Sequence, residues 1–170
     1  MKKHHALFIL LLLITGLKAS AQDFPVPQGY SLKAKEDYAQ YEPNIIASAD
    51  WLQKTPWTDD PNRRKEVTTF LIAWLTGSPT VNIEINGEVA KLIDKNIDLI
   101  AIYMGNYAKY ALQHKDNFDK NQANATALRA MIDKYNNEPT HVKNDEMEHI
   151  IQLNKDGKLD DWIKTDFYKS

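Results

Sequence analysis

The chain has 170 residues, with 21 lysines and arginines against 23 aspartates and glutamates, and it contains no cysteine. A chain without cysteine cannot form disulfides, use a catalytic thiol or hold a metal through thiolates. Its formal charge of -2 offers no attraction to nucleic acid or to an anionic lipid surface, because both kinds of binding depend on an excess of basic residues. We therefore expect no nucleic-acid partner.

The first residues have the organisation of a cleavable export signal. A head with two lysines precedes an apolar run over residues 6–14, and small residues follow up to an Ala-Ser-Ala triplet at residues 19–21. Signal peptidase accepts small side chains at the two ends of such a triplet. The apolar run is shorter than the roughly 20 residues that a membrane-spanning helix needs. The sequence predicts a signal peptide over residues 1–21, export to the periplasm or the extracellular medium, and no membrane insertion after cleavage.

The rest of the chain is predicted to be an arm followed by one domain. Residues 22–31 contain two prolines and one glycine, which predicts a flexible N-terminal arm. Residues 32–170 are long enough to bury a hydrophobic core. Their helical patterns and short polar links predict a single all-α domain, a compact bundle of about five to six helices.

Apolar residues recur at steps of three and four through most of this domain, which indicates amphipathic helices. The first pattern covers residues 38–52, where Pro43 either kinks the helix or lies in the first turn of a helix that begins near Glu42. The clearest pattern covers residues 67–75, after an acidic N-cap at Asp59-Asp60 and before Gly77. Further helices are predicted within residues 97–112, 121–135, 147–155 and 159–167.

Residues 80–87 fit more than one structure. Apolar residues alternate from Val81 to Ile85, and the Asn-Gly pair that follows favours a tight hairpin turn. A two-residue turn there would set Glu88 opposite Ile85 and mix the two faces of the hairpin. We predict a helix from about Glu88 and leave residues 80–87 open between helix, a small β-hairpin and an extended arm.

The most apolar segment after the signal carries the main binding hypothesis. Tyr103, Tyr107 and Tyr110 lie at i, i+4 and i+7 of one predicted helix, and Asn106 falls close to the same stripe. A groove of this composition could hold a sugar ring or a peptide; the alternative is a core stripe whose hydroxyls reach the surface. We expect Tyr110 to be core and Tyr107 to lie toward the edge. Trp57, in a loop between two prolines, is the tryptophan expected to be most exposed and completes the predicted ligand-binding set.

A metal site is the second hypothesis. Glu146 and His149 have the spacing of a Glu-x-x-His metal helix, but a di-iron bundle needs two such motifs and two further glutamates. A zinc site could combine His141 and His149 with an acid such as Asp145. The pattern is also typical of a solvated helical face, so we expect no metal and no cofactor.

These features favour a non-catalytic binding or interaction module of the bacterial envelope, whose partner is a protein or a small molecule. The sequence contains no Gly-x-Ser-x-Gly elbow and no glycine-rich phosphate loop. The alternative function is an exported hydrolase that uses a carboxylate pair or a single metal, with Glu146, His149 and His141 as its candidate residues.

We predict that the exported protein begins at Gln22. Cleavage after Ala21 follows from the small-residue triplet and the short apolar run before it. Intact-mass spectrometry of the protein recovered from the periplasm or the medium should show the loss of residues 1–21. Recovery of the uncut chain in the membrane fraction would contradict this prediction.

Overall fold

A computed structural model describes residues 25–169 of the chain, so the predicted signal peptide over residues 1–21 lies outside the described part. Residues 25–169 contain eight α-helices, one 3-10 turn and no β-strand, which confirms the all-α class. Three of the eight helices have only six or seven residues, and such short helices leave a weak periodic signal in the sequence. Within residues 25–169, no helix combines the length and the apolar character that crossing a bilayer requires.

The first predicted helix is two helices in the structure. Helix α1 spans Lys35–Gln40 and α2 spans Glu42–Lys54, with Pro43 in the first turn of α2. Proline is tolerated there because the first amide groups of a helix have no partner inside the helix. The reading in which a helix begins near Glu42 is therefore the correct one.

Helix α3 spans Pro61–Gly77 and begins at the predicted N-cap. The Asp60 carboxylate accepts a hydrogen bond from the Arg63 amide at 3.2 Å, and Asp60 itself has a left-handed backbone with φ of 44°. Gly77 is the last residue of α3 and does not have a positive φ. A Cβ atom at Gly77 would instead collide with the hydroxyl of Tyr38 from α1. Glycine is needed here for close packing and not for a left-handed cap.

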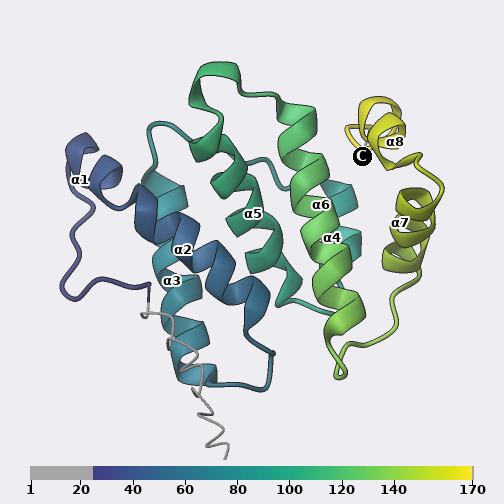
Figure 1. Cartoon of the computed structure of the whole chain (residues 1–170), viewed down its shortest axis with the longest axis horizontal. Helices are drawn as coiled ribbons and strands as arrows, with labels where there is room; N and C mark the ends of the chain where they lie inside the picture. The colour runs from purple at the N-terminus through teal and green to yellow at the C-terminus, as the bar shows by residue number, and fades with distance from the viewer. Residues whose placement is uncertain (1–24, 170) are drawn as a thin grey trace, which may run out of the picture.

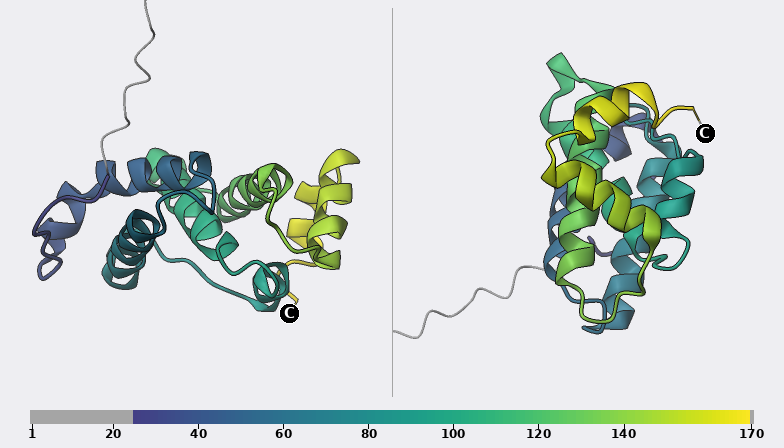
Figure 2. Two further views of the ribbon diagram at one scale, coloured as in Figure 1. Left: turned by 90° about the horizontal axis from the view of Figure 1, so that it is seen from below. Right: turned by 90° about the vertical axis from the view of Figure 1, so that its right-hand side faces the viewer.

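Residues 81–86 have no regular secondary structure, and α4 begins at Gly87. The predicted helix start near Glu88 is thus confirmed to within one residue, and residues 81–86 are neither helix nor hairpin. Figure 2 shows this connection stretched beneath α5 on its way from α3 to α4. The remaining elements are α4 (Gly87–Ile93), α5 (Leu99–Gln113), the 3-10 turn η1 (Lys115–Asn117), α6 (Lys120–Asn137), α7 (Asp145–Lys155) and α8 (Leu159–Thr165).

Helix α5 is the centre of the fold. It packs most extensively against α6 on one side and α2 on the other (Figure 1). The approach of α2 is close at Gly105, where a Cβ atom would lie 3.2 Å from the Ala49 Cβ and 3.3 Å from the Ala49 Cα. The small residues at both positions let the two helix backbones come together. The core around them is built from fully buried large side chains, which include Trp74, Tyr103, Tyr135, Phe70 and Phe167.

The two ends of the described chain are both attached to the domain. Near the start, Tyr30 packs its ring edge-on against Phe70 at 4.8 Å, and the Asn44 amide donates to the Pro25 carbonyl at 2.9 Å. Near the end, Phe167 is buried and its carbonyl accepts a 2.6 Å hydrogen bond from the Asn86 amide. Residues 25–31 of the predicted arm are irregular, but they lie on α2 and α3.

Candidate functional site

The three tyrosines of α5 lie together, as the helical spacing predicts. The Tyr103 and Tyr107 ring centroids are 6.3 Å apart, and the Tyr107 and Tyr110 rings both contact Phe118, at 6.1 and 6.3 Å. Tyr103 and Tyr107 are buried, with 0% and 2% of their surface exposed, whereas Tyr110 is half-buried and stacks on His114. We expected Tyr110 to lie in the core and Tyr107 toward its edge. The structure shows the reverse, because Tyr107 is buried and Tyr110 is only half-buried.

The Tyr103 hydroxyl is committed to a structural hydrogen-bond chain. It donates to the Asn124 side-chain oxygen at 2.5 Å, and the Asn124 amide donates to the Tyr168 hydroxyl at 2.8 Å. The Tyr168 hydroxyl in turn donates to the Asn121 side-chain oxygen at 2.8 Å. Burial raises the pKa of Tyr103 well above that of a free phenol. This hydroxyl joins α5 to α6 and to the C-terminal segment, and its one proton is not available to a ligand.

The Tyr107 hydroxyl is different, because within residues 25–169 it has no hydrogen-bond partner. Its burial, together with the charges of Tyr168 and Glu84, raises the pKa of Tyr107 to about 12. The phenol is therefore neutral at physiological pH and keeps its proton as a donor. The hydroxyl oxygen is not fully buried, so it is able to bond to solvent or to a ligand.

Tyr107 lines a pocket of about 400 Å³ on the side of α5 where residues 80–82 and Phe118 lie. The volume is within the range of small-molecule sites in proteins. We call it the Tyr107 pocket. Its apolar lining is Val81, Tyr107, Ala111, Leu112 and Phe118, and its polar lining is Thr80, Asn82 and Lys115.

Local sequence explains how the walls of the Tyr107 pocket are placed. Ser78, directly after α3, accepts hydrogen bonds from the amides of Thr80 and Val81 at 3.3 and 3.1 Å, which turns the chain toward α5. The side chain of Val81 then packs into the hydrophobic core, and only 5% of the residue is exposed. On the opposite side, Phe118 follows η1 and is 45% exposed. The pocket thus has a buried apolar wall and an accessible aromatic rim.

The charge at the Tyr107 pocket is already balanced. Lys115 is the one charged side chain among its eight lining residues, and its ammonium is 2.5 Å from the Glu42 carboxylate. Glu84, whose charge acts on Tyr107, pairs with Lys120 at 3.0 Å. The groups that a ligand would meet deeper in the pocket are therefore neutral.

The structure does not bring Asn106 into this pocket. Its amide donates to the Ile102 carbonyl at 2.9 Å and to the Gln53 side-chain oxygen at 3.4 Å, so it faces α2. A one-residue step along a helix turns the side chain by about 100°, since an α-helix has 3.6 residues per turn. That rotation places Asn106 and Tyr107 against different neighbours.

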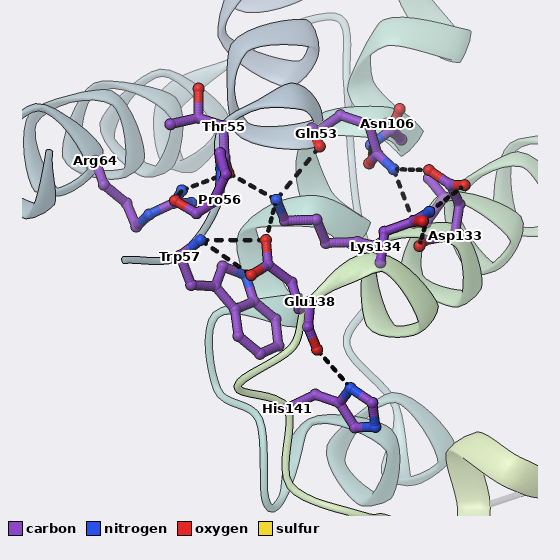
Figure 3. A network of polar contacts seen from close by, with 12 residues as sticks. Gln53, Thr55, Pro56, Trp57, Arg64, Asn106, Asp133, Lys134, Glu138 and His141 are labelled. Carbon is purple, nitrogen blue, oxygen red and sulfur yellow. Dashed lines mark hydrogen bonds and ion pairs between the residues drawn. The ribbon is translucent and has the colours of Figure 1, made fainter. Parts of the chain in front are cut away.

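Trp57 is also distant from the tyrosines, in a buried polar network between α2, α3 and α6 (Figure 3). Its backbone amide donates to both carboxylate oxygens of Glu138 at 3.1 and 3.2 Å. The Trp57 ring is half-buried and packs on the core, like those of Trp51 and Trp162, so it is not set apart by its exposure. The indole NH of Trp57 is buried and has no partner in residues 25–169.

The centre of this network is an ion pair inside the protein. The Lys134 ammonium and the Glu138 carboxylate are 2.5 Å apart, and their side chains are only 4% and 3% exposed. Lys134 also donates to the Thr55 carbonyl at 2.6 Å, and Arg64 donates to the same carbonyl at 2.7 Å. Two cations and one carboxylate thus hold the α2–α3 loop onto the end of α6, which explains their burial structurally.

The histidines of the metal hypothesis do not converge. The His141 Nδ1 donates to the Glu138 carbonyl at 2.6 Å and its ring packs on Tyr135, whereas the His149 ring meets Trp162 of α8 edge-on. Within residues 25–169 no three His, Asp or Glu side chains are grouped to hold a metal ion. The geometry supplies no donor set for the zinc site that the sequence allowed.

Several pocket residues were missed by the sequence analysis. Phe118 is an isolated aromatic residue in a run of charged and amide residues between two helices, and that isolation is the one signal that could have drawn attention to it. Val81 was seen only as part of an ambiguous segment. Ala111 and Leu112 belong to an apolar helix end whose partner could not be inferred from periodicity.

No family model, no curated protein and no solved structure matches this chain. The function is accordingly inferred from the residues and their geometry.

We predict that Lys134→Met lowers the free energy of unfolding by about 3–5 kcal/mol, because it leaves the buried Glu138 carboxylate without its counter-charge. Lys54→Met is the matched control: Lys54 is exposed at the end of α2, so its replacement should change stability by no more than about 0.5 kcal/mol. Chemical denaturation of both variants tests this. Equal stability of the two variants would show that the ion pair is not buried as described.

The stability of the protein should depend on the Tyr103 hydroxyl but not on the Tyr107 hydroxyl. Tyr103→Phe leaves the Asn124 oxygen unpaired and should cost about 1–3 kcal/mol. Tyr107→Phe removes a hydroxyl without a partner, so the change should stay within about 0.5 kcal/mol. Thermal and denaturant unfolding of both variants gives the comparison, and a large loss in Tyr107→Phe would reveal a partner for that hydroxyl.

Alkaline pH provides a second readout on the same variants. Because the folded state raises the pKa of Tyr107 from 10 to about 12, it binds the phenol proton more tightly than the unfolded chain does. That stabilisation is complete below about pH 10, the pKa of an unperturbed tyrosine. It is lost as the pH rises toward 12, so Tyr107→Phe should show a smaller alkaline loss of stability than the parent protein.

Proposed function

We propose that this chain is an exported, non-catalytic binding protein of the bacterial envelope and that it holds a small ligand in the Tyr107 pocket. The export signal that the sequence predicts over residues 1–21 supports the location. The observation that carries the binding role is Tyr107, whose side chain is 2% exposed and lines an apolar hollow, and whose hydroxyl has no hydrogen-bond partner within the described chain.

Another hollow on the described surface supports this choice by contrast. The one between α4 and the start of α7 has a similar volume of about 440 Å³, but its lining consists of one alanine and six charged or amide side chains. Acidic and basic groups there can satisfy one another. Ligand sites are more often apolar with a few polar groups, which is the composition of the Tyr107 pocket.

The binding role can be tested by nuclear magnetic resonance on the isotope-labelled exported protein. The probes are three small compounds with one apolar body, 4-propylphenol, 4-propylbenzoate and 4-propylbenzylamine. We expect at least one of them to shift the amide signals of Val81, Ala111 and Leu112. Ala111→Phe should weaken that binding at least tenfold, because the new ring fills the pocket.

Ala90→Phe is the matched control, since Ala90 is exposed on α4 and lies outside the Tyr107 pocket. Circular dichroism should show that both variants are folded. If none of the three compounds shifts these signals, or if binding is the same in Ala111→Phe and Ala90→Phe, the proposed function is wrong.

A further inference from the structure

We propose that the ligand of the Tyr107 pocket is an uncharged amphipathic molecule, with an apolar ring or short chain that contacts Phe118 and Leu112 and a neutral hydroxyl or amide that meets the Tyr107 hydroxyl. This inference rests on the proposed function and specifies the chemistry of its ligand. It follows from the size of the pocket, from its neutral polar groups and from the pairing of the charges around it.

The size and lining of the pocket fit one ring with a short extension. A cavity of about 150 Å³ lined by apolar side chains is enough to hold benzene, and the Tyr107 pocket has about 400 Å³, part of which opens to solvent beside Phe118. Val81, Ala111 and Leu112, each no more than 9% exposed, form the inner wall. A ring placed against Phe118 would add aromatic contact to the burial of apolar surface.

The hydrogen-bonding groups that line the pocket are neutral. The Tyr107 hydroxyl can donate to a carbonyl or accept from a hydroxyl or an amide. Beside it, Thr80 and Asn82 contribute a hydroxyl and a side-chain amide. The backbone amide and carbonyl of Asn82 are not bonded to another group of residues 25–169. A neutral polar group on the ligand would find both donors and acceptors at this rim.

A negatively charged ligand is disfavoured at Tyr107. The raised pKa of this residue has burial as its main cause, and the negative charge of Glu84 adds to it. The same surroundings oppose a carboxylate next to the hydroxyl. Lys115 does not offset this effect, because its ammonium is already paired with Glu42.

A positively charged ligand is disfavoured for a related reason. An ammonium group that leaves water for an apolar site needs a carboxylate to compensate its lost hydration. No carboxylate is among the eight residues that line the Tyr107 pocket, and the nearby Glu42 and Glu84 are paired with Lys115 and Lys120. The pocket thus selects against both signs of charge.

The test compares the affinities of 4-propylphenol, 4-propylbenzoate and 4-propylbenzylamine for the exported protein at pH 7, by calorimetry or by titration of amide signals. A phenol has a pKa near 10 and is neutral at this pH. We expect the phenol to bind at least tenfold more tightly than either ion. Glu84→Gln should narrow the gap between phenol and benzoate, because it removes a nearby negative charge without touching the lining.

Removal of the hydroxyl isolates the contact on which the inference depends. Tyr107→Phe should weaken 4-propylphenol binding about 2- to 13-fold, which corresponds to a net hydrogen bond of about 0.5–1.5 kcal/mol. Tyr110→Phe is the matched control on the same helix, since Tyr110 does not line the pocket, and it should leave the affinity unchanged.

The outcomes separate this inference from the proposed function. If benzoate or benzylamine binds as tightly as the phenol in a manner that Ala111→Phe abolishes, the pocket is a ligand site but the ligand class is wrong. Unchanged phenol affinity in Tyr107→Phe would also overturn the inference. If none of the three compounds binds, both the inference and the proposed function fall.

Discussion

The close packing of α5 between α2 and α6 is the constraint on which the other features depend. Gly105 faces Ala49 where α2 comes near, so the rotation of α5 about its own axis is fixed by contacts that leave no room for a larger side chain. That rotation points Asn106 toward Gln53 and Tyr107 toward Phe118. The position of the pocket is therefore decided on the opposite side of the helix from the pocket itself.

Two arrangements of polar groups occur in the interior: one in which the groups are paired, and one in which a hydroxyl has no hydrogen-bond partner. In the network around Lys134 and Glu138, each charge is met by a counter-charge or a carbonyl, which is the condition under which charged groups can be buried. Burial raises the pKa of Tyr107, but the hydroxyl of this residue has no hydrogen-bond partner in the described chain. The first arrangement fastens a loop to the domain, whereas the second leaves one hydrogen-bonding group unused beside an apolar surface.

The sequence predicted the helices well where one face is apolar, as in α3 and α6, and where a cap is explicit, as at Asp60. It placed three tyrosines on one side of α5 but reversed the burial of Tyr107 and Tyr110. Periodicity predicts which side of a helix a residue lies on, but not which segments pack against that side. The segment beside Tyr107 consists of the irregular residues 80–82. Lys134 and Glu138 were missed because an i, i+4 ion pair is typical of an exposed helical face.

The hydrogen bond between Phe167 and Asn86 limits the order in which contacts can form during folding. Asn86 both accepts from the Val89 amide at the start of α4 and donates to the Phe167 carbonyl, across 81 positions of sequence. A contact so distant along the chain closes late in folding, because a long loop has to be ordered first. A chain that is threaded through an export channel from its N-terminus cannot make it until residue 167 has passed. For a chain exported as we propose, the contact that fixes the C-terminal segment to α4 therefore forms only after almost the whole polypeptide has been translocated.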